Sequence, residues 1–138
     1  MNTYIPNIPD IDKKRIVIIG GGFAGLKFVR KMVCQGYQIV ILDKNNYHQF
    51  QPLLYQVATS GLEPSAISFP FRKILQNFKH THFRIASLIE IFKDKNEIQT
   101  SIGKLKYDYL ILAMGATTNF FGQKNIEKFS LSMKTSAD

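Results

Sequence analysis

The chain has 138 residues, a net charge of +8, 45% hydrophobic residues and one cysteine. This length suits one folded domain with its own core, and it excludes a cofactor domain joined to a separate substrate domain. The chain lacks both the apolar run of about 18 residues that a bilayer-crossing helix needs and the basic and apolar zones of a signal peptide, so we expect a cytoplasmic protein.

The first predicted element is a buried strand that runs directly into a glycine-rich turn. Residues 15–19 are nearly all β-branched, which is typical of a central strand in a parallel sheet covered on both faces. Gly20, Gly22 and Gly25 then follow with GxGxxG spacing. The first glycine of this motif allows a tight turn, the second lets a pyrophosphate approach the backbone, and the third lets helix and strand pack closely. The start of the next helix offers free N–H groups and a positive dipole end to a diphosphate.

The next two predicted elements complete a βαβ unit. Apolar positions at helical spacing after Gly25 predict an amphipathic helix of about three turns that ends near Gly36, and residues 37–42 predict a second buried strand. Asp43 closes that strand 18 residues after Gly25, near the spacing of roughly 20 at which a carboxylate binds the hydroxyls of an adenosine ribose. The pattern favours dinucleotide binding over a generic βαβ unit, and it leaves FAD and NAD both open.

The segment that follows, residues 45–61, contains little charge and many aromatic and amide side chains. Apolar bulk mixed with a few hydrogen-bonding groups is typical of a pocket lining. An ordinary covering loop with a short helix is the alternative, and composition alone does not decide between them.

Shorter elements are predicted in the second half of the chain. Pro70 and an apolar stripe predict a helix over residues 70–78, and alternation predicts a strand over residues 83–91. Turns around residues 97–100 predict another short strand. We expect the later strands to form a small antiparallel meander packed on the parallel sheet, which makes the fold α/β and Rossmann-like with covering helices.

Three features bear on other functions. The basic residues are spread along the chain without a nucleic-acid-binding motif, so a solvated basic face is favoured, with weak attraction to anionic lipid as the alternative. His80 and His82 have no carboxylate or cysteine at ligand spacing, so we expect surface histidines and no metal. Cys34 cannot form an internal disulfide, and we expect it to be a buried thiol on the first helix.

Taken in order, the glycine turn, Asp43, residues 47–58 and the stretch from Tyr107 to Gly115 resemble the N-terminal part of type II NADH dehydrogenases, the non-electrogenic NADH:quinone oxidoreductases. The similarity runs from about residue 13 to residue 135. The aromatic-Pro-Leu-Leu-Tyr-Gln segment within it is not shared by flavoproteins at large. The resemblance implies that the dinucleotide is FAD and that the fold is the FAD domain of a flavoprotein with two dinucleotide-binding domains.

The resemblance also implies a set of positions that contact FAD along its length. At the pyrophosphate and adenosine end, the implied residues are Gly20, Gly22, Phe23, Ala24, Gly25, Asp43, Lys44 and Leu88. At the ribityl and flavin end, and at the turn that approaches the cofactor, they are His48, Gln49, Pro52, Leu53, Ala113 and Gly115. Met114 stands where the family has threonine, and no catalytic side chain is implied.

The same resemblance implies a domain division and a set of partners. It divides the chain into an extension over residues 1–12, an incomplete FAD-binding domain over residues 13–122, and residues 123–138 leading towards an NADH domain. In the whole enzyme, hydride passes from NADH to FAD and two electrons then pass to quinone. With a single GxGxxG, this chain alone is expected to be inactive.

Family members bind the cytoplasmic face of the inner membrane as peripheral proteins, so association with a membrane surface is an expectation. Pairing with a second copy through an exposed surface is another. The alternatives are a non-catalytic FAD- or NAD-binding module, or another flavoenzyme of the pyridine nucleotide-disulfide type. Among these, a sulfide:quinone reductase is disfavoured because its chemistry needs redox cysteines.

Overall fold

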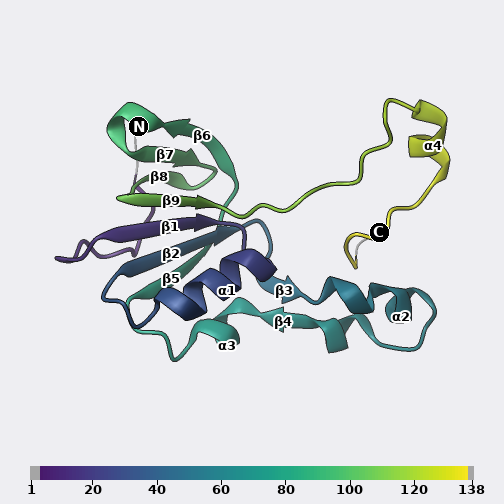
Figure 1. The fold of residues 1–138 in the computed structure, drawn as a ribbon, viewed down its shortest axis with the longest axis horizontal. Helices are drawn as coiled ribbons and strands as arrows, with labels where there is room; N and C mark the ends of the chain where they lie inside the picture. The colour runs from purple at the N-terminus through teal and green to yellow at the C-terminus, as the bar shows by residue number, and fades with distance from the viewer. Residues whose placement is uncertain (1–3, 137–138) are drawn as a thin grey trace.

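The computed structural model describes residues 4–136. Residues 1–3 of the predicted extension and residues 137–138 of the predicted C-terminal segment lie outside this range. A four-stranded parallel sheet forms the centre of the molecule, with strand order β5-β2-β1-β9. Its strands are β1 (Arg15–Ile19), β2 (Gln38–Asp43), β5 (Thr81–Ile85) and β9 (Tyr109–Leu112) (Figure 1). This arrangement confirms the predicted Rossmann-like parallel sheet.

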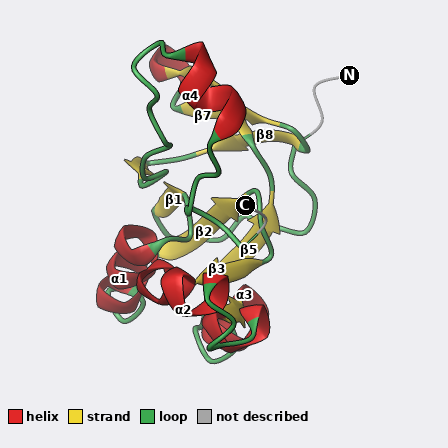
Figure 2. Cartoon of the chain, turned by 90° about the vertical axis from the view of Figure 1, so that its right-hand side faces the viewer, coloured by secondary structure: helices red, strands yellow, loops and turns green. Residues whose placement is uncertain are grey.

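Both faces of the sheet are covered, as the β-branched strands predict. Alternate residues of β1 and β2 enter two different apolar cores, because successive side chains on a strand point to opposite faces. Ile16 and Ile18 pack against helices α1 (Phe23–Met32) and α3 (Phe71–Leu75). Val17 and Ile19 pack under the antiparallel meander. The strands of the meander are β6 (Leu88–Phe92), β7 (Glu97–Thr100) and β8 (Gly103–Lys106). Figure 2 shows the meander on one side of the sheet and helices α1 and α3 on the other.

A long excursion between β2 and β5 extends away from the sheet (Figure 1). Its two strands pair antiparallel, and its outer end carries short helices. Its elements are β3 (Tyr47–Gln49), the 3₁₀ helix Gln51–Leu53, α2 (Leu54–Ala58), the 3₁₀ helix Pro64–Ile67 and β4 (Ser68–Pro70). Another 3₁₀ helix, Lys93–Lys95, joins β6 to β7. After β9, residues 113–136 form an arm that carries α4 (Lys124–Phe129) and returns towards the excursion (Figure 1).

The single strand predicted over residues 83–91 is wrong. The chain makes two strands there, since β5 ends at Ile85 in the parallel sheet and β6 begins at Leu88 in the meander. The chain passes from the parallel sheet to the meander at Ala86. This residue is buried and donates its N–H to the Asp43 carbonyl oxygen at 2.9 Å, which fixes the position of the passage. The two strands pack on different cores, with Phe83 of β5 under the helices and Leu88 and Ile91 of β6 under the meander. Apolar residues recur on both sides of the break, so the alternating pattern does not reveal it.

The structure also corrects three smaller expectations. Helix α1 ends before Gly36, and Cys34 lies exposed in the turn after the helix, not buried on it. The helix over residues 70–78 is shorter, because α3 spans only Phe71–Leu75. His82 is half-buried within β5, whereas His80 is exposed as expected. Burial lowers the pKa of His82, and the nearby Arg84 guanidinium lowers it further.

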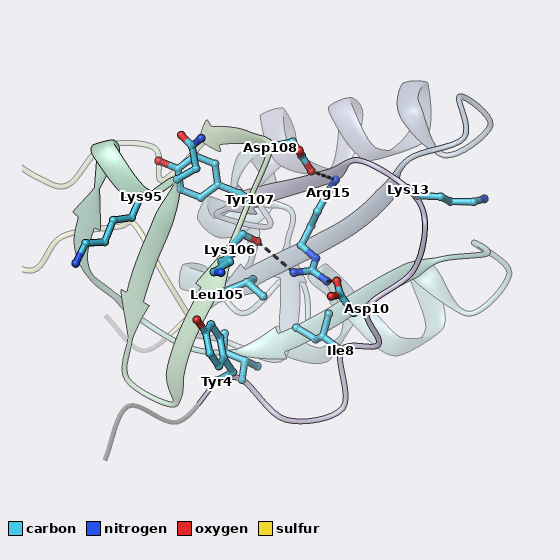
Figure 3. Close-up of a pocket in the computed structure, with 12 residues that line it drawn as sticks. Tyr4, Ile8, Asp10, Lys13, Arg15, Lys95, Leu105, Lys106, Tyr107 and Asp108 are labelled. Carbon is cyan, nitrogen blue, oxygen red and sulfur yellow. Dashed lines mark hydrogen bonds and ion pairs between the residues drawn. The ribbon is translucent and has the colours of Figure 1, made fainter.

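The N-terminal segment packs on the amino ends of the central strands. Ile5 is buried and donates its N–H to the Lys104 carbonyl oxygen at 2.9 Å. Arg15 Nε donates to the buried Gln38 Oε1 at 2.6 Å, and Gln38 Nε2 donates to the Pro9 carbonyl oxygen at 2.7 Å. Ile5 and Arg15 line a cavity of about 550 Å³. Arg15 also forms an ion pair with Asp10 at 3.1 Å (Figure 3). Arg15 and Gln38 together fasten the segment to the sheet.

Replacing Gln38 by leucine tests this fastening. The variant Gln38→Leu leaves Arg15 Nε and the Pro9 carbonyl oxygen without their partner, so we expect a loss of about 1–3 kcal/mol in the free energy of unfolding. Urea denaturation measures the loss. Gln35→Leu, at an exposed glutamine in the turn after α1, is the matched control and should change stability by less than about 0.5 kcal/mol. Equal losses in the two variants would contradict the role given to Gln38.

A second prediction concerns Glu97, which joins the N-terminal segment to the meander. Its carboxylate lies 3.1 Å from Lys104 Nζ and accepts a hydrogen bond from the Tyr4 hydroxyl at 3.2 Å. The bond from Lys104 holds the pKa of Glu97 below its usual value of 4.5, helped by Tyr4 and opposed by burial. The stabilisation is therefore present above pH 4.5 and is lost as pH falls through the folded-state pKa.

The measurement is the thermal midpoint of wild type and of Glu97→Gln across this acidic range. The difference between the two proteins should be largest near neutral pH and should shrink as the carboxylate is protonated. A difference that does not depend on pH would show that the charge of Glu97 contributes nothing.

Candidate cofactor site

The carboxyl ends of β1, β2 and β9 meet at one edge of the sheet, and the predicted site residues lie there. The glycine turn follows β1, Asp43 ends β2, and Ala113 follows β9. Helix α1 begins at Phe23, directly after the turn. A cavity of about 430 Å³ opens at this edge. In open α/β sheets, ligands bind outside the carboxyl ends of the strands, so this cavity has the position of a cofactor site.

Two glycines of the motif are required by the packing of the protein itself. Gly20 has φ +104°, and a Cβ placed on it would lie 2.3 Å from the Ala113 carbonyl oxygen. A Cβ on Gly25 would lie 2.0 Å from the Gly20 carbonyl oxygen. Real Cβ atoms do not approach backbone so closely. Any side chain at either position would therefore push β1 away from β9 or from α1.

Gly22 differs from both. Its φ is −71°, which any residue adopts, and apart from its immediate neighbours in the chain no described protein atom lies within 4 Å of the place where its Cβ would be. The protein's own packing therefore does not account for a glycine here. Open space over the backbone at the helix N-terminus is what a bound pyrophosphate requires, so the turn fits a dinucleotide.

Gly21 stands at a position that the GxGxxG motif leaves open to any residue, yet it contacts the side chains of Asp43, His48 and Phe71. Its N–H donates to Asp43 Oδ2 at 2.7 Å, and its carbonyl oxygen lies 3.1 Å from His48 Nδ1. A Cβ on Gly21 would lie 2.2 Å from Cζ of Phe71. Sequence reasoning missed this position, and the only signal was the run of three glycines.

Asp43 is half-buried and held by backbone donors. Besides the bond from Gly21, its Oδ1 accepts the N–H of Asn45 at 2.9 Å. Each carboxylate oxygen thus has one partner and keeps capacity for a second hydrogen bond. The carboxylate can bind hydroxyl donors without moving.

The excursion contributes the other wall of the cavity. Phe23 and His48 meet edge to face with ring centroids 5.1 Å apart, and Phe23 meets Phe50 in the same way at 5.5 Å. Gln49 Nε2 is buried and has no hydrogen-bond partner among residues 4–136. Its Oε1 accepts the N–H of Ser136 at 3.4 Å. A buried N–H donor without an acceptor destabilises the folded protein. A bound ligand that supplies the acceptor would remove this penalty, so the unpartnered nitrogen also fits a cofactor.

The cavity brings together most of the predicted contact residues. Those that line it are Gly20, Gly22, Phe23, Ala24, Asp43, Lys44, His48, Gln49, Ala113 and Gly115. The cavity is also lined by Asn45, Tyr47 and Gln51 of the segment proposed as a pocket lining, and by Met114 of the turn after β9. Those that sequence reasoning missed are Gly21, Ala116, Thr117, Lys134 and Thr135. The last two come from the returning arm, where the Lys134 carbonyl oxygen accepts a bond from Gln51 at 3.2 Å.

Four predicted residues do not line this cavity. Gly25 lies beneath the turn, where it packs against Gly20. Pro52 and Leu53 lie in the 3₁₀ helix that follows β3, beyond the cavity wall. Leu88 begins β6 and packs against the core under the meander.

Two other classes of site receive no support from the part of the chain that the structure describes. Residues 4–136 hold no group of three or more histidine, cysteine, aspartate or glutamate side chains that could bind a metal ion. Within the same range, no helix has the length and apolar character needed to cross a membrane.

Comparison with known proteins identifies the family. The model of the pyridine nucleotide-disulphide oxidoreductases matches residues 14–138. This chain belongs to that family. Among curated relatives, it is 32% identical to the type II NADH:quinone oxidoreductase Ndh of Mycobacterium tuberculosis, a match that covers 91% of this chain and 28% of the relative. The resemblance to the N-terminal part of type II NADH:quinone oxidoreductases is thereby confirmed.

Solved structures of similar proteins agree with the fold. NDH2 from Plasmodium falciparum in complex with NADH has a TM-score of 0.77 at 27% identity, covering 86% of this chain and 25% of that one. The sulfide:quinone oxidoreductase from Aquifex aeolicus has a TM-score of 0.71 at 28% identity, covering 80% and 27%. The chain therefore spans about a quarter of the length of these relatives.

The same substitution should have different effects at two of the motif glycines, Gly25 and Gly22. Gly25→Ala forces a Cβ onto the Gly20 carbonyl and should cost about 1–3 kcal/mol or more in unfolding free energy. Gly22→Ala meets open space and should stay within about 1 kcal/mol of wild type. Urea denaturation of both variants without added cofactor measures the difference. Comparable losses at both positions would mean that Gly22 is also needed for packing.

Proposed function

We propose that this chain is the N-terminal, FAD-binding portion of a flavin-dependent NADH:quinone oxidoreductase. The observation that carries the proposal is the open space over Gly22, between the start of α1 and the Asp43 carboxylate. The family match and the unpartnered Gln49 Nε2 beside this space support it. Under this proposal, residues 13–122 are the FAD-binding unit, and residues 123–138 lead towards an NADH-binding domain.

Helix α1 is suited to receive the pyrophosphate. Gly22 caps the helix without a side-chain hydrogen bond, and the first turn carries no acidic residue. The N–H groups of Phe23 and Ala24 are thus not blocked by a side-chain cap, and no like charge opposes the phosphates. Gly115, with φ +73° and open space where a Cβ would be, lets the chain after β9 approach the cofactor from the other side.

The remaining roles follow the order of the residues around the cavity. Asp43 would accept the adenosine ribose hydroxyls, with Lys44 beside it. His48 and Gln49 would lie along the ribityl chain, where Gln49 Nε2 would gain an acceptor that residues 4–136 do not supply. Pro52 and Leu53 would lie near the flavin ring, and the backbone of Leu88 near the adenine.

When bound, FAD supplies the capacity to take a hydride from NADH and to pass two electrons to a quinone. Within this chain, the residues only bind and orient the cofactor. The partners of the whole enzyme would be NADH and a quinone, at the cytoplasmic face of a membrane. Pairing with a second copy of the chain belongs to the same proposal.

The similarity to a sulfide:quinone oxidoreductase raises one alternative, in which cysteines beside the flavin carry the reaction. Cys34 does not favour it. The residue follows the carboxyl end of α1, whereas the cavity meets the amino end of that helix, ten residues away. A helix of this length separates its two ends by about 15 Å.

The test is the visible absorption spectrum of the purified chain before and after FAD is added and the sample is desalted. We expect retained flavin in wild type. In Asp43→Ala the loss of charge-assisted bonds should weaken FAD binding about 10- to 100-fold, and Gly22→Val should abolish it. Asp94→Ala, at an exposed aspartate beyond β6, is the control and should bind like wild type.

A parallel titration with NAD⁺ separates the outcomes. FAD binding without comparable NAD⁺ binding supports the proposal. Binding of NAD⁺ alone would contradict it, as would FAD binding that is unchanged in Asp43→Ala and Gly22→Val.

A further inference from the structure

Beneath the glycine turn lies the ring of Phe71, a residue that no cofactor motif includes. A Cβ on Gly21 would lie 2.2 Å from Cζ, 2.5 Å from Cε1 and 3.2 Å from Cε2 of this ring. The edge of the ring therefore occupies the volume that any side chain at Gly21 would need. The contact joins the first residue of α3 to the turn after β1, fifty positions apart in the chain.

Phe71 is itself held from several sides. Its side chain is 1% exposed and packs with Ile16, Ile18 and other residues of the core under the helices. The centroid of its ring lies 4.6 Å from the centroid of the Phe83 ring on β5. The backbone N–H of Phe71 donates to the Asn46 carbonyl oxygen at 3.0 Å. A ring fixed in this way cannot move aside, so it determines how close Gly21 comes to the sheet.

The position of Gly21 matters because two groups of the cofactor cavity depend on it. Asp43 Oδ2 accepts its N–H at 2.7 Å, and His48 Nδ1 lies 3.1 Å from its carbonyl oxygen. Since Gly21 is also the residue before Gly22, a shift of its backbone moves the open space over Gly22 as well. The Phe71 ring, the turn and the two side chains thus form one connected unit.

We propose that Phe71 is a positioning residue for the cofactor, acting through Gly21, and that glycine is required at position 21 because this ring fills the space. The inference rests on the proposed function, since it concerns the FAD cavity. Gly21 is not among the glycines with positive φ, so alanine is excluded there by the ring and not by backbone conformation. A smaller residue at position 71 should therefore make alanine acceptable at position 21.

A double-mutant cycle with Gly21→Ala and Phe71→Leu tests this, with FAD affinity and the thermal midpoint of the cofactor-free protein as readouts. Gly21→Ala should weaken FAD binding at least about tenfold, because the turn is pushed away from Asp43 and His48. Phe71→Leu should weaken it several-fold, since the turn loses its support. The double variant should bind FAD more tightly than Gly21→Ala alone, and its thermal midpoint should recover in parallel.

The matched control is Phe78→Leu, which changes a half-buried aromatic that packs on the same core. It should lower the thermal midpoint and leave FAD affinity unchanged. FAD affinity that is equally reduced in Phe71→Leu and Phe78→Leu would overturn the inference, as would a double variant whose losses are the product of the single losses. Both results leave the proposed function standing if wild type binds FAD. Absence of FAD binding in wild type overturns both proposals.

Discussion

At the turn between β1 and α1, backbone packs directly on backbone, and the rest of the cavity depends on this contact. Gly20 approaches the Ala113 carbonyl, and Gly25 approaches the Gly20 carbonyl, with no room for a methyl group at either place. Backbone cannot rotate out of the way as a side chain can. The carboxyl end of β1, the carboxyl end of β9 and the start of α1 are therefore fixed relative to one another, and the space over Gly22 follows from their arrangement.

The main elements could be predicted because their signals are local. Runs of β-branched residues mark the buried strands, and the glycine spacing with Asp43 marks the turn and the acidic group beside it. The break between β5 and β6 could not be predicted from alternation, since apolar residues recur on both sides of it although the two strands pack on different cores. The exposure of Cys34 depends on where α1 ends, and helix ends are the least certain part of a sequence pattern.

The contacts that complete the candidate site were not predictable in the same way. Gly21 meets a ring that is fifty residues distant, and Lys134 and Thr135 reach the cavity from a returning arm. Periodicity and spacing carry no information about which distant segments meet. The resemblance to a family supplied Gln49 as a candidate, but only the fold reveals that one nitrogen of this side chain is buried without a partner among the described residues.

The fastening of the N-terminal segment by Arg15 and Gln38 lies at the amino ends of the same strands whose carboxyl ends form the cavity. Substitutions at the amino ends can therefore raise thermal stability without altering the cavity, which lies a full strand length away. The reverse does not hold, because the close packing of Gly20, Gly21 and Gly25 at the carboxyl ends serves the core and the cavity together. Stability is thus free to evolve at one end of the sheet only.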